Sequence, residues 1–141
     1  CEALGEGGCF EALDPGPVNA NDDRLDAAAW IPFSDMRRGK LIIFCQCKTG
    51  SSWKEHTTQL QPDAFINRWM KHRTFLVLPV RAFCVSESTC PNHWGGLVGY
   101  AGLLFDRLRL VDFLDRIEPD LLERIRTWNA AAATVAAKAI N

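Results

Sequence analysis

The stretch 40–48, which reads KLIIFCQCK, decides the fold because it is the clearest β-strand in the chain. Its first half is apolar on both faces, which is typical of a central strand that is covered on both sides. Gln46 and Lys48 then interrupt the apolar run. Because successive side chains of a strand alternate between its two faces, these polar residues point the same way. The stretch therefore predicts a central strand with a polar pair at its C-terminal end.

A shorter strand and a turn precede this stretch. Residues 25–30 form an apolar run that ends just before a proline, which favours a strand because the run is too short for a helix. Residues 34–39 are polar and end in a glycine, as a hairpin turn does. Residues 1–22 are broken by glycine and proline and are expected to be mostly irregular. If the two strands pair through the turn, Asp26 comes near Gln46 at one end of the sheet.

The rest of the chain predicts helices and further strands. The motif S-x-x-E at 52–55 is a capping box and predicts the start of a helix. Proline at the first helical position marks two more helix starts. The expected elements are a helix over 52–60, a helix over 62–70, a strand region over 74–85 with Pro79 as a bulge or break, a strand over 107–113, and a long helix from Pro119. The stretch 94–100 favours neither state.

This order of elements predicts the α/β class, with a mixed central β-sheet flanked by helices. A length of 141 residues, 48% hydrophobic and 23% charged, suits one globular domain over 1–141. The chain begins with Cys1 rather than Met, so we interpret it as a fragment that lacks its upstream part.

Composition sets limits on partners and location. The net charge of -1 gives no basic excess that would point to nucleic acid, although a neutral protein can still carry a small basic face. No apolar run reaches the ~18 residues that a membrane helix needs, and the start of the chain has no signal peptide. We therefore expect a cytoplasmic protein with no membrane segment.

The chain contains six cysteines, and their spacing argues for a structural role. One C-x-C and one C-x5-C are present, whereas zinc sites usually have two C-x-x-C pairs. Cys45 and Cys47 also lie in an apolar run, where cysteine behaves as a small hydrophobic residue. A zinc-stabilised interaction domain is the alternative interpretation.

Asp26, Gln46 and Lys48 form the candidate catalytic set. Phosphodiester hydrolysis requires a cation that neutralises the phosphate and activates a water molecule. Mg²⁺ takes hard oxygen ligands, which would come from the carboxylate of Asp26, the amide of Gln46 and the backbone carbonyl of Cys47. Lys48 would hold the attacking water or a phosphate oxygen.

Other residues near this set are rival acids or candidates for binding the substrate. Asp22 and Asp23 are rival acids, but Asp26 is favoured because apolar residues flank it and an unpaired carboxylate there would be costly. His56 and Lys54, which follow the motif, are candidates for contacting a substrate phosphate. The alternative for both is an exposed surface role.

The stretches 23–29 (DRLDAAA) and 41–48 (LIIFCQCK) resemble the PD-(D/E)xK nuclease superfamily. The resemblance is to its Mrr-type restriction endonuclease branch, in which Gln replaces Glu in the last motif. It implies a restriction-endonuclease-like fold and DNA cleavage with Mg²⁺, or with Mn²⁺ as an alternative ion. It also implies a role in restriction or anti-phage defence. Because a fragment this small offers no recognition module of its own, we expect other domains or subunits to supply the specificity.

The sequence departs from the family pattern in two ways. An acidic residue that often precedes the first motif is unassigned, with Glu2, Glu6 and Glu11 as candidates. The glycines that often precede the motif Asp are absent, and Arg24 and Leu25 stand there. Gln46 also removes a negative charge from the metal site, so the alternative is a catalytically degenerate nuclease-fold module that serves binding or assembly.

Overall fold

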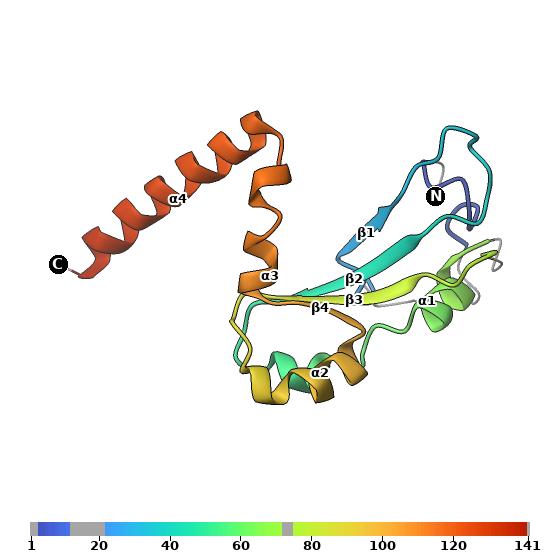
Figure 1. The fold of residues 1–141 in the computed structure, drawn as a ribbon, viewed down its shortest axis with the longest axis horizontal. Helices are drawn as coiled ribbons and strands as arrows, with labels where there is room; N and C mark the ends of the chain where they lie inside the picture. The colour runs from blue at the N-terminus through green and yellow to red at the C-terminus, as the bar shows by residue number, and fades with distance from the viewer. Residues whose placement is uncertain (1–2, 12–21, 72–74, 141) are drawn as a thin grey trace. The chain divides into compact units, whose positions relative to one another are not determined.

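The computed structural model describes residues 3–11, 22–71 and 75–140 (Figure 1). The chain divides into two compact units, Cys1–Arg107 (unit 1) and Leu108–Asn141 (unit 2). The sequence suggested a single domain over 1–141, whereas each of these units is described by itself below. No helix in the described ranges combines the length and the hydropathy that crossing a membrane requires.

A mixed four-stranded sheet with the strand order β1-β2-β3-β4 forms the centre of unit 1. Strand β1 (Ala27–Trp30) is antiparallel to β2 (Ile42–Lys48). Strand β2 is parallel to β3 (Val80–Val85), which is parallel to β4 (Leu103–Phe105). The predicted α/β class with a mixed sheet is therefore confirmed, and β2 is one of its two central strands.

Helices connect the parallel strands of unit 1, and helices are the elements of unit 2 in the described residues. In unit 1, η1 (Trp53–His56), α1 (Pro62–Trp69), η2 (Pro91–His93) and α2 (Trp94–Ala101) connect the parallel strands. Figure 1 shows α1 and α2 on the same side of the sheet. The elements of unit 2 are α3, which begins at the boundary (Arg107–Val111), η3 (Leu114–Arg116) and α4 (Pro119–Ile140).

The face of the sheet toward α1 and α2 carries the hydrophobic core. Alternation along the strands sends one set of large side chains to this face, where they form two clusters. The first joins Ile42 and Phe44 to Leu60 and Ile66, and the second joins Trp53 to Phe83, Val85, Ala101 and Leu104. Each of these side chains is at most 3% exposed. Full burial of a large apolar side chain stabilises the fold by about 1.5–3 kcal/mol, so this face holds unit 1 together.

The opposite face of the sheet is more open. The side chains that alternate to it include Ala27, Ala29, Cys47 and Leu103, all of which are exposed. Ile43 is half-buried there. The sequence predicted that β2 is covered on both faces. Among the described residues of unit 1, the large buried strand side chains lie on one face, whereas the smaller Cys45 and Ala82 are buried on the other.

Two of the predicted elements are wrong. The stretch 107–113 was expected to be a strand, but Arg107–Val111 forms α3. The apolar and basic residues that alternate there are exposed, and no strand in the described part of the chain pairs with them. The helix expected over 52–60 is only the short η1, and the Ser52 side chain does not make the capping hydrogen bond that the motif predicted.

The other differences concern where elements begin. Strand β3 begins directly after Pro79, which cannot donate a hydrogen bond to a neighbouring strand, and residue 74 lies outside the described ranges. The ambiguous stretch 94–100 is helical. The helices expected from Pro62 and from Pro119 are confirmed. Of the residues expected to be irregular, 3–11 form turns and one bridge to Met70, and 12–21 lie outside the description.

Candidate functional site

Asp26 lies directly before β1 and is fixed to β2 by two hydrogen bonds. Its N–H donates to the carbonyl of Cys45 at 3.0 Å. The first residue of β1 also pairs with Cys45, so two successive residues oppose one, as in a β-bulge. The carboxylate Oδ2 of Asp26 accepts the N–H of Cys47 at 2.6 Å. The exposed acid is therefore held against the backbone of β2 at the point where β1 stops.

The same edge of β2 presents a second oxygen donor. In an antiparallel pair of strands, the backbone N–H and C=O of one residue point to the same neighbouring strand. The N–H of Cys47 points to the side of β1, where it meets Asp26, so the carbonyl of Cys47 projects to that side as well. This edge therefore offers two of the three oxygen ligands that the sequence suggested.

Gln46, the third suggested ligand, lies in different surroundings. It is completely buried, at 0% exposure. Its Nε2 donates to Oε1 of Gln59 at 3.5 Å, and Nε2 of Gln59 lies 2.7 Å from Nδ1 of His56. Among the described residues, Oε1 of Gln46 has no hydrogen-bond partner. A buried acceptor left in this way costs about 1–3 kcal/mol, so this atom requires a donor or a cation.

Gln59 is a residue of the site that the sequence analysis missed. It connects buried Gln46 to half-buried His56, which the sequence had proposed for phosphate binding. The available signal was its spacing, because Gln59 follows His56 by three residues and such pairs lie side by side on a helical turn.

The two predicted lysines differ in their surroundings. Lys48 is half-buried, and alternation along β2 places it on the same face as Gln46. Its ammonium has no hydrogen-bond or ion-pair partner within the described part of the chain. Lys54 is exposed, and its Nζ lies 5.7 Å from the centroid of the Trp53 ring, at cation–π distance. Lys54 therefore stands apart from the polar chain that joins Gln46 to His56.

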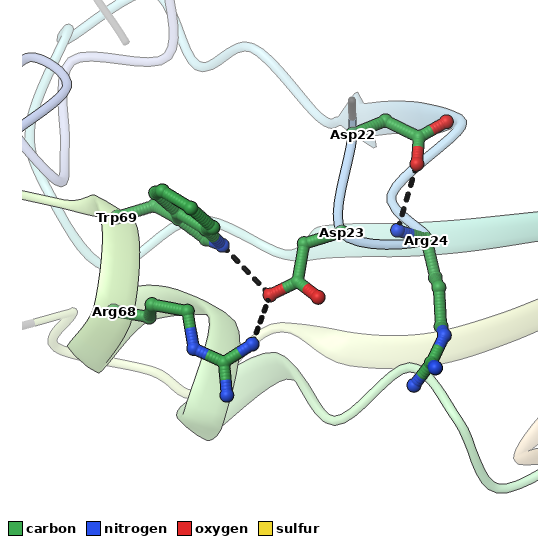
Figure 2. A network of polar contacts seen from close by, with 5 residues as sticks. All are labelled: Asp22, Asp23, Arg24, Arg68 and Trp69. Carbon is green, nitrogen blue, oxygen red and sulfur yellow. Dashed lines mark hydrogen bonds and ion pairs between the residues drawn. The ribbon is translucent and has the colours of Figure 1, made fainter. Parts of the chain in front are cut away.

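The rival acids have structural roles, as Figure 2 shows. Oδ2 of Asp23 accepts hydrogen bonds at 2.7 Å from both Arg68 and the indole of Trp69, at the end of α1. Oδ1 of Asp22 accepts the N–H of Arg24 at 2.9 Å, as in an Asx turn. Of the three neighbouring acids, Asp26 is the one bonded to β2.

Glu6, a candidate for the early acid, also has a structural role. It is 3% exposed and accepts the N–H of Gly39 at 2.6 Å, of Lys40 at 3.4 Å and of Leu76 at 3.3 Å. Burial alone would raise its pKa, but these backbone donors and the charge of Arg38 outweigh burial and hold the pKa below its ordinary value. The carboxylate thus fastens the N-terminal turns to the strand hairpin.

A second cluster, of thiols, lies on the open face of the sheet. The Sγ atoms of Cys45, Cys47 and Cys84 all lie within 4.8 Å of one another. Cys45 and Cys84 share a hydrogen bond at 3.2 Å, which raises the pKa of Cys45 and lowers that of Cys84 to about 7. Burial raises the pKa of Cys47. The sequence favoured structural cysteines over a zinc site. It did not reveal that Cys84 approaches Cys45 and Cys47, because that approach depends on how two strands pair.

The predicted site residues are thus partly brought together. Asp26 lies against Cys47, and Gln46 is connected to His56, but the exposed carboxylate and the buried amide have separate partners.

Comparison with known proteins assigns no family, because no family model, no curated protein and no solved structure matches the chain.

Proposed function

We propose that this chain is a metal-dependent nuclease that hydrolyses DNA phosphodiester bonds at the edge between β1 and β2. Asp26, Gln46 and Lys48 are its catalytic residues. The observation that carries the proposal is the hydrogen bond from the N–H of Cys47 to the carboxylate of Asp26. This bond holds the carboxylate of Asp26 against the backbone of Cys47, which lies between Gln46 and Lys48 in β2. A restriction-endonuclease-like arrangement of the mixed sheet is part of the same proposal.

The residues at this edge suit Mg²⁺, which prefers hard oxygen ligands. The carboxylate of Asp26 and the carbonyl of Cys47 would hold the ion, and Oε1 of Gln46 is a buried acceptor in need of a partner. When bound, the ion neutralises phosphate charge and lowers the pKa of a bound water. Mn²⁺ accepts the same oxygen ligands.

The side chains of the protein then have separate tasks. In the hydrolysis, a water oxygen forms a new bond to phosphorus, the bond to the leaving oxygen breaks, and that oxygen takes up a proton. Lys48, a compact charge without an ion-pair partner among the described residues, would hold the water or a phosphate oxygen. Gln59 orients Gln46, and His56 with Lys54 would bind the substrate phosphate.

The biological setting belongs to the same proposal. DNA is the substrate, the cytoplasm is the compartment, and restriction or anti-phage defence is the process. Other domains or subunits would supply the sequence specificity.

Cleavage of plasmid DNA in the presence of Mg²⁺ tests the proposal. Lys48→Ala is expected to lower the rate by about a hundredfold or more, the usual effect of removing one electrostatic stabiliser from an active site. Lys71→Ala, which removes an exposed lysine outside the site, should leave the rate unchanged. Equal cleavage by wild type and Lys48→Ala would remove Lys48 from the catalytic set.

The burial of Gln46 favours a second candidate function, a degenerate nuclease-fold module used for binding or assembly. The amide is completely buried and uncharged, so Asp26 is left as the one carboxylate of the proposed set. Calorimetric titration with Mg²⁺ and Mn²⁺ separates the two candidates. An absence of binding heat for both ions favours the degenerate module.

A further inference from the structure

The three clustered thiols form a geometry that the proposed nuclease site does not use. Cys47 and Cys84 are directly paired residues of β2 and β3, and Cys45 lies two positions earlier on the same face as Cys47. The pairing of two central strands therefore fixes all three sulfurs. Such a cluster is preorganised, because no loop has to fold around a ligand.

The distances suit a soft metal ion. Tetrahedral Zn²⁺ with bonds of about 2.3 Å to sulfur places its ligand sulfurs about 3.8 Å apart. The three Sγ atoms lie within 4.8 Å of one another, and the Cys45–Cys84 pair lies at 3.2 Å. An ion could enter between them with small rotations of the side chains.

The surroundings leave room for an ion and access to it. Cys45 is flanked across the sheet by Ala27 on one side and Ala82 on the other, whose small side chains do not crowd the sulfur. Cys47 is exposed, so the cluster opens to solvent. Cys45 itself is buried, so a metal ion would reach it from the side of the exposed Cys47.

We propose that Cys45, Cys47 and Cys84 bind one thiophilic metal ion, Zn²⁺, on the open face of the sheet. Thiolates select Zn²⁺ and Cu⁺ over Mg²⁺ and Ca²⁺. Three protein ligands leave a fourth position for water or an external ligand, unlike the closed four-ligand sites that serve structure alone.

This site shares Cys47 with the proposed nuclease site, which uses the backbone carbonyl of that residue, but it uses sulfur atoms that the nuclease site does not. The thiols of Cys45 and Cys47 point away from the face that carries Gln46 and Lys48, because neighbouring residues of a strand face opposite ways. The donors also differ in kind, sulfur in one site and oxygen in the other. A test that reads sulfur–metal bonds therefore gives its answer whether or not the chain cleaves DNA.

Cobalt is the probe for this test, because Co²⁺ replaces Zn²⁺ and shows charge-transfer absorption when thiolates bind it. The full chain is stripped of metal with a chelator, kept reduced, and titrated with Co²⁺ and then with Zn²⁺. We expect thiolate–cobalt absorption that saturates at one ion per chain and is displaced by Zn²⁺.

Two variants assign the absorption to the cluster. Cys84→Ser should weaken Co²⁺ binding by about a hundredfold or more, since even changes in outer-shell partners cost up to that factor. Cys90→Ser, which removes an exposed free cysteine outside the cluster, should bind as wild type does. Circular dichroism shows whether each variant keeps its fold, and the wild-type titration stands without either variant.

Three outcomes would overturn the proposal. One is an absence of thiolate–cobalt absorption in the reduced wild-type chain. Another is a stable Cys45–Cys84 disulfide, detected by mass spectrometry, in a protein that still takes up no metal once that disulfide has been reduced. Unchanged binding by Cys84→Ser would equally place the ion elsewhere.

Discussion

At the scale of single residues, the burial of Gln46 is the feature with the clearest consequences. The side chain is completely enclosed, yet Oε1 has no partner among the residues that the structure describes. The pair Gln46–Gln59 also has a long hydrogen bond of 3.5 Å, so the amide is loosely held for a core group. An acceptor buried without a partner needs an explanation, and a bound cation is one that can be tested.

Replacing the amide by a carboxylate tests this interpretation. We expect Gln46→Glu to lower the free energy of unfolding by about 3 kcal/mol or more without metal, because an unpaired charge would be buried. Mg²⁺ should restore part of the loss if the ion binds beside the new charge. Urea denaturation with and without Mg²⁺ measures both effects.

The exposed residue Gln61 provides the control for this change. Gln61→Glu should alter stability little and show no specific response to Mg²⁺. A Gln46→Glu chain whose stability ignores Mg²⁺ would contradict the assignment of Gln46 as a ligand.

Glu6 gives a prediction about pH. Its pKa is held below the ordinary value of 4.5, so the ionised form stabilises the fold at neutral pH, and this contribution is lost as the pH falls through the lowered pKa. Glu6→Gln should lower the free energy of unfolding by about 1–3 kcal/mol at neutral pH. Denaturation over a pH series should show the stabilities of the two proteins converging as the pH falls from 4.5 through the lowered pKa of Glu6. A difference that stays constant into acid would contradict the ionic role of Glu6.

At the scale of elements, the turn between α2 and β4 depends on one glycine. Gly102 has φ of +78°, and a Cβ there would lie 2.4 Å from the carbonyl oxygen of Arg81. Only glycine allows the chain to leave α2 and enter β4 beside β3 in this way. Strand β4 contributes Leu104 to the second core cluster, so the turn and the core depend on each other.

Gly102→Ala should therefore destabilise unit 1 by about 1–3 kcal/mol, from backbone strain, or more if the strand shifts. Gly96→Ala is a control with the opposite sign. It lies inside α2 with open space around the position of its Cβ, and alanine favours helix over glycine by about 1 kcal/mol. Thermal unfolding of both variants gives the comparison. Equal stability of Gly102→Ala and wild type would show that the turn is not under this constraint.

The elements differ in how far the sequence alone could predict them. Strand β2 and helices α1 and α4 have patterns long enough to be recognised locally. Strand β4 is short and exists because β3 pairs with it, while α2 contains three glycines and depends on packing rather than on propensity. Patterns along the chain do not show which strands pair or which helices are stabilised by packing.

The same limit applies to the candidate sites. Asp26, Gln46 and Lys48 could be chosen from the sequence because polar residues interrupt or flank apolar strands. The partnership of Cys84 with Cys45 depends on the register between strands, which no spacing along the chain reveals. The bulge at Asp26, which gives its carboxylate a backbone partner, is equally a product of strand pairing.

At the scale of the whole molecule, the chemistry is concentrated in one unit. Both core clusters, the oxygen donors and the thiols all lie within Cys1–Arg107. In Leu108–Asn141, large apolar side chains of α4 such as Trp128 and Val135 are more than 60% exposed. Unit 2 thus contributes none of the proposed ligands or catalytic groups.

A truncated chain that ends at Arg107 should therefore keep a cooperative unfolding transition and any metal-dependent cleavage of DNA. Its stability should differ from that of the full chain by about 1 kcal/mol or less, because both core clusters lie within Cys1–Arg107. Urea denaturation followed by the tryptophans of unit 1 measures this. Loss of the cooperative transition would show that unit 1 requires unit 2.

The most direct measurement is the cleavage rate of a labelled DNA duplex by the full chain, with Mg²⁺ and with chelator, compared with Asp26→Asn. The asparagine oxygen can still accept the N–H of Cys47, so the edge of the sheet should keep its structure while losing its carboxylate. We predict cleavage that needs Mg²⁺ and falls by about a hundredfold or more in Asp26→Asn. An intact wild-type chain that leaves the duplex uncut, or an Asp26→Asn chain that cuts it as fast as wild type, would contradict the proposed function.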